Sequence, residues 1–274
     1  MSVINTNVKS LIAQQALATN NRSLSKAMEQ LSTGKRINSA ADDAAGLSIT
    51  SKMTAQIRGL NQAVRNANDG ISMIQTVEGA LNEVTNMLQR MRELSVQSIN
   101  GTNSSSDRTS LDTEFDQLSA EISRISDNTT WNGMKVLGSE ATTYAFQVGP
   151  DSTATVTATF IDIDVSGSTI GSAIDIGVDS VSAATSALTQ LDSAISVVST
   201  YRSTLGAMVN RLNYTVDNLT NVATNTSESR SRILDADYAA TTTELARTQI
   251  IQQAATAMLA QANQSPQSVL SLLK

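Results

Sequence analysis

The sequence predicts a mainly α-helical protein, a long antiparallel helical bundle or coiled coil with a small β-rich insert in the middle of the chain. Two observations support this fold class. Apolar residues make up 40% of the 274 residues but aromatic residues only 3%, so Leu, Ile, Val, Met and Ala at helical spacing must supply the core. The chain contains only two prolines, Pro150 and Pro266, which interrupt helices by removing a backbone donor.

The first helical segment is predicted to end at Gly34, which suits a left-handed C-cap. Its apolar stripe consists of Ile4, Val8, Leu11, Leu17, Leu24, Met28 and Leu31. Asp42 and Asp43 then precede a second helix. Carboxylates at that place accept hydrogen bonds from free N–H groups and complement the helix dipole, so capping is favoured over a catalytic carboxylate pair.

The strongest periodic pattern runs from Met53 to Leu94, with apolar residues spaced by three and four. It indicates a coiled-coil-like helix from near Gly46 to Asn100, which at about 1.5 Å per residue is roughly 80 Å long. A helix of this length needs partners along its length. Residues 111–125 and 188–219 repeat the spacing, and Ser106 or Asp107 is expected to cap the first of these partners. Together they predict an antiparallel bundle.

The middle of the chain differs in composition from both ends. Residues 133–179 are rich in β-branched residues with period-2 alternation, as in MKVL, TYAFQV, TATVTATFIDIDV and AIDIGV, so short strands or hairpins are expected. No basic residue lies between Lys135 and Arg202. The acids of this stretch are Glu140, Asp151, Asp162, Asp164, Asp175, Asp179 and Asp192. Asp162 and Asp164 resemble the start of a calcium loop, but no Glu stands at the twelfth position, and a half-exposed strand is favoured.

A second apolar stripe lies near the C-terminus. It consists of Ile251, Ala255, Met258 and Ala262, with Val269, Leu270, Leu272 and Leu273 beyond Pro266. Both terminal stripes are narrow, rich in Ala, and flanked by Gln, Asn, Ser and Thr. They can pair with each other or bury themselves against other molecules, and periodicity alone does not choose. Membrane-active helices are disfavoured because the stripes lack abundant basic residues and large aromatic ones.

Several functional classes are excluded or disfavoured by composition. The chain has no Cys and no His, which excludes disulfides, thiolate nucleophiles, imidazole bases and Cys or His metal sites. No glycine-rich phosphate loop is present, so we expect no catalytic, cofactor or metal site. A net charge of −6 argues against nucleic acid. No apolar run is long enough to span a membrane, and the first residues lack the pattern of a cleaved signal peptide.

The two ends of the sequence resemble the terminal segments of bacterial flagellins. The N-terminal resemblance is carried by MSVINTNVKSLIAQQALATNNRSLSKAMEQLSTGKRINSAADDAAGLSI, and the C-terminal one by LARTQIIQQAATAMLAQANQSPQSVLSLL. LQRMRELSVQSINGTNSSSD and NTTWNGMKVL are similar to the family as well. The resemblance covers most of residues 1–138 and 185–274. It implies a non-enzymatic subunit of the flagellar filament that serves swimming motility, in a short form with a minimal central region.

The resemblance also implies a division of the chain. Residues 1–45 would form the N-terminal half of an inner coiled coil plus a connecting spoke, and residues 229–274 its C-terminal half. The outer bundle would use residues 46–138 and 183–228, with residues 139–182 as a small acidic insert. The implied assembly seam consists of Val8, Leu11, Leu24, Met28, Leu31, Ile251, Ala255, Met258, Val269 and Leu272.

The partners implied by the resemblance are copies of the same chain, a flagellar export chaperone, the filament cap and hook-associated proteins. Subunits would be secreted unfolded and join an extracellular filament. The vertebrate Toll-like receptor that senses flagellin would contact Arg90, Leu94 and Glu114, which Gln89 and Gln97 flank. Leu94 also lies on the apolar seam, so a packing role competes with receptor contact there.

Two other functions stay open at this point. A hook–filament junction protein of the same apparatus would form only short, limited assemblies. A type III secreted effector or translocator with coiled-coil arms would associate with membranes.

Overall fold

The structure, a computed structural model, describes residues 6–138, 143–161, 163 and 169–271, with the backbone alone for residues 265–271. Its helices are α1 (Val8–Thr33), α2 (Ala44–Ile99), α3 (Ser105–Asn128), α4 (Thr169–Ile174), α5 (Val181–Leu234) and α6 (Tyr238–Ser271). Its strands are β1 (Thr130–Trp131), β2 (Met134–Lys135), β3 (Thr143–Gln147) and β4 (Thr155–Thr159). The chain forms two compact units, one of residues 58–223 and one of residues 1–57 with 224–274.

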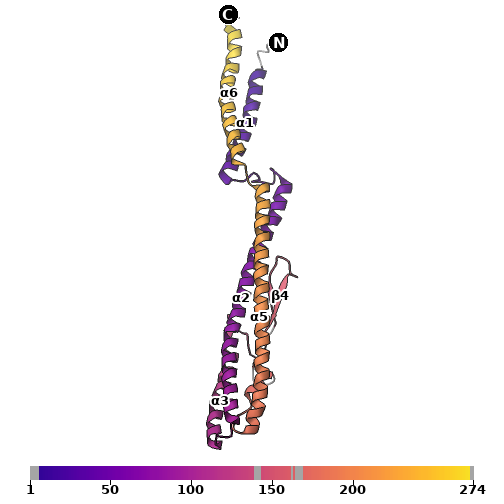
Figure 1. The fold of residues 1–274 in the computed structure, drawn as a ribbon. Coiled ribbons are helices and arrows are strands. Elements are labelled where there is room, and N and C mark those ends of the chain that lie inside the picture. The colour runs from indigo at the N-terminus through magenta and orange to yellow at the C-terminus, as the bar shows by residue number, and fades with distance from the viewer. Residues whose placement is uncertain (1–5, 139–142, 162, 164–168, 272–274) are drawn as a thin grey trace. The chain divides into compact units, whose positions relative to one another are not determined.

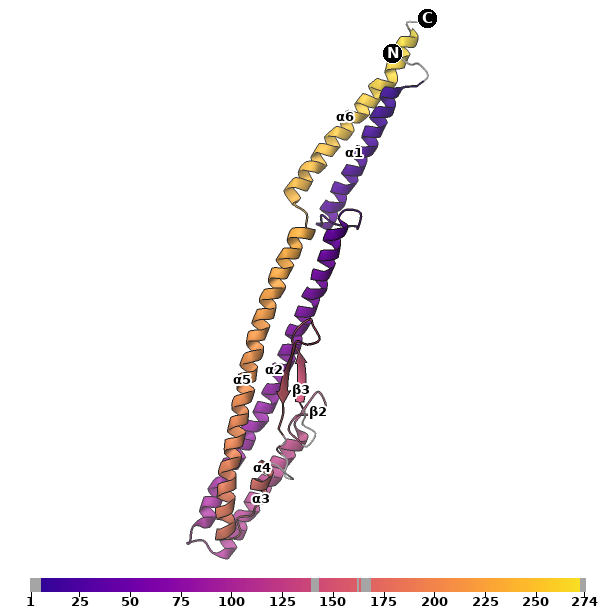
Figure 2. The ribbon, with the colours of Figure 1, turned by 90° about the vertical axis from the view of Figure 1, so that its right-hand side faces the viewer.

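The unit of residues 58–223 is a helical bundle in which α2 and α5 run antiparallel and α3 lies beside α2 (Figures 1 and 2). The predicted seam of α2 forms the centre of its core, and its fully buried members include Ile74, Val77, Leu81, Val84, Leu88 and Met91. Phe115 of α3 and Leu191 of α5 pack into the same cluster and are also fully buried. Each such side chain contributes about 1.5–3 kcal/mol by leaving water. The predicted bundle is therefore confirmed.

The ends of α2 agree with the sequence prediction, whereas the start of α3 differs from it. Helix α2 begins and ends within two residues of the predicted limits. The N-cap of α3, however, is Ser104 and not Ser106 or Asp107. The hydroxyl of Ser104 accepts a hydrogen bond from the backbone N–H of Asp107 at 3.3 Å, and the Asp107 carboxylate accepts one from the N–H of Ser104 at 2.9 Å. This reciprocal capping box satisfies two helix donors, which a cap at Asp107 would leave free.

Two hairpins lie in or next to the stretch where short strands or hairpins were expected. Strands β1 and β2 pair across Asn132 and Gly133, whose positive φ angles of 48° and 79° suit a tight two-residue turn. Strands β3 and β4 pair antiparallel, with Thr143 opposite Thr159 and Gln147 opposite Thr155. Ile4, Glu140, Asp162 and Asp164 lie outside the described residues.

Two expectations for local structure are wrong. The stretch AIDIGV does not form a strand, because its first residues belong to α4. Ile170, Ala173 and Ile174 of that helix are buried, and this spacing of three and four places them on one helical face. Helix α6 also continues through Pro266, where an interruption was expected.

The β3–β4 hairpin packs on α2 at small residues. A Cβ atom added to Gly70 would lie 3.0 Å from the Phe146 ring, which is closer than an ordinary contact, so the ring would have to shift to admit it. The Asn66 amide of α2 donates a hydrogen bond to the Gln147 carbonyl at 3.1 Å. Tyr201 of α5 donates its hydroxyl hydrogen to the Thr159 carbonyl at 3.2 Å, and burial raises the pKa of Tyr201 to about 12. The hairpin is thus attached to the bundle on two sides.

Candidate assembly arms and their connecting segment

Helices α1 and α6 lie side by side in the unit of residues 1–57 and 224–274 (Figures 1 and 2). We call these two helices the arms. The side chain of Asn7 caps α1 by accepting a hydrogen bond from the N–H of Ser10 at 3.2 Å. Gly34 ends α1 in the left-handed conformation, with φ of 69°, and its N–H donates to the Gln30 carbonyl at 2.9 Å. The predicted C-cap is confirmed.

The most deeply buried side chains on the inner side of the arm pair are mostly polar, and half-buried leucines lie between them, namely Leu17, Leu24, Leu31, Leu245 and Leu259. Asn20 is 8% exposed, and its amide donates a hydrogen bond to the Thr248 carbonyl of α6 at 2.8 Å. The Asn7 amide donates to the Ala262 carbonyl at 2.8 Å, and the Ser10 hydroxyl donates to the side-chain oxygen of Asn263 at 3.0 Å. Ala27, at 3% exposure, is the only hydrophobic side chain that is buried among the described residues of α1.

The outer sides of the arms carry the large apolar side chains. Of the predicted seam residues, Val8, Leu11, Met28, Ile251 and Met258 are exposed. Ile12 and Ile250 are also exposed, at 63% and 66%. Leu24, Leu31 and Ala255 are half-buried, whereas the side chains of Val269 and Leu272 lie outside the described part. The arms therefore pair with each other, but most of their apolar stripe does not take part in that pairing.

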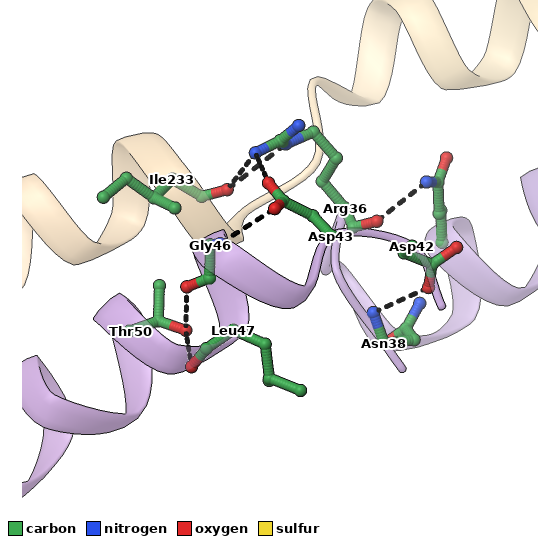
Figure 3. Close-up of polar contacts among 9 residues, drawn as sticks. Arg36, Asn38, Asp42, Asp43, Gly46, Leu47, Thr50 and Ile233 are labelled. Carbon is green, nitrogen blue, oxygen red and sulfur yellow. Dashed lines mark hydrogen bonds and ion pairs between the residues drawn. The ribbon is translucent and has the colours of Figure 1, made fainter. Parts of the chain in front are cut away.

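The segment between α1 and α2 closes the C-terminal end of α5 (Figure 3). The Arg36 guanidinium donates two hydrogen bonds to the Ile233 carbonyl, at 2.9 and 3.2 Å. The backbone N–H of Arg36 donates to the Leu234 carbonyl at 2.7 Å, and the N–H of Ala236 donates to the Gly34 carbonyl at 3.0 Å. Carbonyls at a helix end have no partner within the helix, and this short backbone pairing supplies partners for them. The role of Arg36 was not predicted.

Asp42 and Asp43 have different tasks in the same segment (Figure 3). Asp43 caps α2 as predicted, because its carboxylate accepts from the Gly46 N–H at 2.8 Å, and it also lies 3.7 Å from the Arg36 guanidinium. For Asp42 the capping prediction is wrong. Its carboxylate accepts from the N–H groups of Asn38 and Ser39 at 3.2 and 3.1 Å. The Lys26 ammonium, 2.8 Å away, is the main cause that lowers the pKa of Asp42 to about 2.

The residues assigned to receptor contact by resemblance fall into two groups. Gln89, Arg90 and Gln97 of α2 and Glu114 of α3 are exposed. Arg90 and Glu114 form an ion pair at 2.8 Å, and this contact raises the pKa of the Arg90 guanidinium. Leu94 is only 1% exposed and packs in the bundle core. The structure thus assigns Leu94 to packing and leaves the other four on the surface.

Neither a metal centre nor a membrane span was found where the structure describes the chain. Within the described ranges, no three Asp or Glu side chains are grouped so that they could hold a metal ion. The same part of the chain contains no helix with the length and hydropathy that crossing a membrane requires.

Comparison with known proteins identifies the family. Residues 4–142 match the model of the bacterial flagellin N-terminal helical region, and residues 188–273 match that of the bacterial flagellin C-terminal helical region. The chain is 48% identical to a flagellin of Halalkalibacterium halodurans, over 99% of this chain and 100% of that protein. The chain belongs to the bacterial flagellin family. It is thus a structural subunit of the flagellar filament, and its place is the flagellum.

Other flagellins and filament proteins show where this flagellin stands in the family. It is 43% identical to the flagellar filament 33 kDa core protein of Treponema phagedenis, over 99% of this chain and 100% of that protein. Alignment with flagellin B of Vibrio anguillarum, at 36% identity, needs 371 positions, so that relative carries segments that this 274-residue flagellin lacks. The crystal structure of Bacillus cereus flagellin is similar in fold, with a TM-score of 0.51 and 33% identity, and the match covers 61% of this chain and 94% of that one.

Proposed function

We propose that the arms of this flagellin reach their stable packing only when copies of the chain polymerise. The observation that supports this is that Ile12 and Met258 are exposed on the arms, whereas polar Asn20 and Thr248 are among the side chains buried between them. Ordering a residue costs about 1–2 kcal/mol of backbone entropy. The buried area that must offset this cost, at about 25 cal/mol per Å², lies on the outer apolar faces and becomes available against neighbouring copies. Assembly is then coupled folding and binding.

The surface of the arms suits contact between identical chains. The charged side chains of α6 from Tyr238 to Gln264 are Glu244 and Arg247, and these two neutralise each other at 2.8 Å. The remaining polar side chains of that stretch are uncharged, so copies approach one another without strong repulsion. The assembly seam we assign consists of Val8, Leu11, Leu24, Met28, Leu31, Ile251, Ala255, Met258, Val269 and Leu272.

Within the filament we assign residues 1–45 and 229–274 to an inner coiled coil with its connecting spoke. Residues 46–138 and 183–228 would then form a surrounding layer, with the insert of residues 139–182 facing solvent. Because the insert is small and acidic, we expect a thin filament whose surface charge keeps neighbouring filaments apart. The hydrogen bonds of Arg36 and Asp43 would hold the spoke at the junction of the two layers.

Export and extracellular assembly belong to the same proposal. A chain without Cys and with two prolines suits transport in an unfolded state, because no disulfide can form early and few slow proline steps delay refolding. An export chaperone, the filament cap and hook-associated proteins are the partners we expect along this route, and a secreted filament is the end point. No step of it requires catalysis by the chain itself.

The exposed face of α2 and α3 is our proposed contact for the Toll-like receptor that senses flagellin, through Gln89, Arg90, Gln97 and Glu114. Arg90 is held in place by Glu93 at 3.0 Å and Glu114 at 2.8 Å, which presents a fixed cation on the surface. Arg90→Ala should weaken signalling by the free subunit. Arg92→Ala is the matched control, because Arg92 is paired with Asp192 of α5. An unchanged response to Arg90→Ala would remove Arg90 from the contact.

Deletion of residues 1–30 tests the assembly proposal directly. The shortened chain should keep the circular dichroism and melting temperature of the bundle, because the core of residues 58–223 does not use α1. It should form no filaments after addition of ammonium sulfate or filament seeds, as judged by electron microscopy beside the full chain. Filaments of the deleted chain would contradict the proposal.

The full chain also tests the two alternative functions. Short limited assemblies would favour a junction protein, and association with membranes would favour a translocator.

A further inference from the structure

We propose that Asn7 and Asn20 set the register in which α1 pairs with α6, an inference that rests on the proposed coupled folding of the arms. Both side chains use their amide groups as donors to backbone carbonyls of α6, Asn7 to Ala262 and Asn20 to Thr248, each at 2.8 Å. Backbone carbonyls, unlike side chains, occur at every position of a helix. Which carbonyls the two amides reach therefore depends on the axial position of α1 along α6.

The hydrogen bonds between the arms all fit a single antiparallel register. Asn7 lies thirteen residues before Asn20 in α1, and its acceptor Ala262 lies fourteen residues after Thr248 in α6. At the base of the arms, the N–H of Ala236 pairs with the Gly34 carbonyl in the same register. Contacts thus recur about every two heptads, which is the spacing at which a coiled-coil seam returns to the same side of a helix.

The acceptor of Asn7 has a particular property that follows from Pro266. In a regular helix the carbonyl of Ala262 would accept a hydrogen bond from the N–H of residue 266, four positions later. Residue 266 is proline and has no N–H, so α6 continues through it with the Ala262 carbonyl left without that bond. The Asn7 amide takes the place of the missing donor at 2.8 Å. Asn7 therefore binds a carbonyl that differs from the neighbouring carbonyls of α6, because it lacks a donor within the helix.

Apolar contacts alone would not determine this register. The inner side of the pair buries the small side chains of Ser10, Asn20 and Ala27 most deeply. The half-buried Leu17, Leu24 and Leu31 recur every seven residues, so similar apolar contacts return when one helix shifts along the other. A shift by one helical turn, about 5.4 Å, takes both carbonyls out of reach of the two amides. The Asn20 side chain, 8% exposed, would then lie beside the longer side chains of Leu245 or Gln252 in place of the small Thr248. A polar group inside a helix seam selects register in this way and gives up some stability for it.

Register matters here because the outer surface is built from both arms. A groove on this surface is lined by Lys9, Ile12, Ala13, Met258, Gln261 and Ala262, three residues from each arm. Sliding α1 along α6 would separate Ile12 from Met258 and remove the groove. A neighbouring copy that packs on the arms would then meet a different surface. Asn7 and Asn20 thereby determine whether the arms present one reproducible face for polymerisation.

The register can be read with thiol pairs, because the natural chain has no Cys. Asn21→Cys with Gln252→Cys reports the natural register, since these side chains are hydrogen-bonded at 3.2 Å. Asn21→Cys with Thr256→Cys reports a shift of about one turn. Dibromobimane, which bridges two nearby thiols and becomes fluorescent when both react, is applied to filaments grown from a minority of reporter subunits and a majority of natural chain. We expect the natural pair to be bridged at least about tenfold more than the shifted pair.

Asn20→Leu is then introduced into both reporter chains, with Gln264→Leu, an exposed change on α6, as the matched control. The proposal expects Asn20→Leu to abolish the preference for the natural pair and Gln264→Leu to keep it. Retention of the tenfold preference in Asn20→Leu filaments would overturn the role of Asn20. Exclusion of Asn20→Leu alone from growing filaments, at an unchanged melting temperature of the bundle, would be a stronger form of the expected result. If the natural chain itself forms no filaments, the proposed function fails and not the register.

A rescue experiment tests the link between Asn7 and Pro266. Asn7→Asp keeps the side-chain oxygen that caps α1 but removes the amide donor to the Ala262 carbonyl, and it should raise the critical concentration for polymerisation about tenfold. Pro266→Ala restores the missing N–H, so the double variant Asn7→Asp/Pro266→Ala should recover most of that loss. A loss that Pro266→Ala does not reduce would show that Asn7 acts in some other way and would overturn this part of the proposal.

Discussion

Arg36 and Asp43 show how two side chains complete two different helix ends. Arg36 donates to the last carbonyls of α5, and Asp43 accepts from the first free N–H groups of α2 (Figure 3). Their mutual ion pair at 3.7 Å is half-exposed and contributes little by itself. The larger contribution comes from the backbone groups that they satisfy, because such groups are costly when left without a partner.

Asp43→Ala should therefore lower the stability of the assembled arms and spoke by about 1 kcal/mol, the usual cost of losing an N-cap. The measurement is the temperature at which filaments dissociate, followed by light scattering. Glu228→Ala is the control, since Glu228 pairs only with Arg232 on the surface of α5 and its removal should change little. Equal effects of the two substitutions would contradict a capping role.

Asp42 should make the filament sensitive to acid. Its pKa in the folded chain is lowered to about 2, chiefly by the Lys26 ammonium, from an ordinary value of 3.8. A lowered pKa stabilises the fold above the ordinary value, and this contribution is lost as the pH falls from about 4 to about 2. Filaments of Asp42→Asn should accordingly show a shallower loss of stability over this range in light scattering. An identical pH profile would exclude Asp42 as a contributor.

At the level of the elements, α2 carries glycines in two contrasting environments. A Cβ atom on Gly70 would lie 3.0 Å from the Phe146 ring of β3, closer than an ordinary contact, whereas nothing lies within 4 Å of the position of a Cβ on Gly79. Both positions lie inside the helix, where glycine costs up to about 1 kcal/mol relative to good helix formers. Substitutions at Gly70 and Gly79 therefore distinguish the effect of helix propensity on stability from the effect of packing.

Gly70→Leu should destabilise the bundle by about 1–3 kcal/mol, because the added side chain displaces the β3–β4 hairpin. Gly79→Leu should instead stabilise it by a little less than about 1 kcal/mol through helix propensity alone. Chemical denaturation of the free subunit measures both. A gain of stability in Gly70→Leu would show that the hairpin is not packed against α2 as described.

For the whole molecule, the two compact units differ in how they are held together. Residues 58–223 contain an apolar core from Ala67 to Leu212, whereas the most deeply buried side chains of the arms are mostly Ser, Asn and Thr and their inner leucines are only half-buried. Local stability follows buried apolar contacts, so the two units should open with very different free energies. This difference is what would allow the arms to fold at the moment of assembly.

Hydrogen exchange measured on free subunits and on filaments tests this difference. In the free subunit, amides of α1 and α6 should exchange within seconds to minutes, while those around Leu81 to Met91 of α2 should persist for much longer. In filaments the arms should become protected as well. Full protection of both arms in the free subunit would contradict coupled folding.

The sequence by itself predicted the helices of the bundle and the family. Spacing of three and four predicted α2, α3 and α5, because a helix returns the same face at that interval whatever lies opposite. Gly34 and Asp43 were predictable as caps because each satisfies groups within a few residues of itself. The terminal segments indicated a flagellin through their order of residues alone.

Only the tertiary structure decided which groups each helix face contacts. Leu94 proved to be buried, Asp42 turned toward Lys26, and AIDIGV began as part of α4, since each depends on side chains far away in the sequence. The polar interior of the arms is the clearest case. An apolar stripe reveals that a helix has a surface to bury, but contacts such as that of Asn20 with Thr248 determine which surface turns toward the same chain and which remains for another copy.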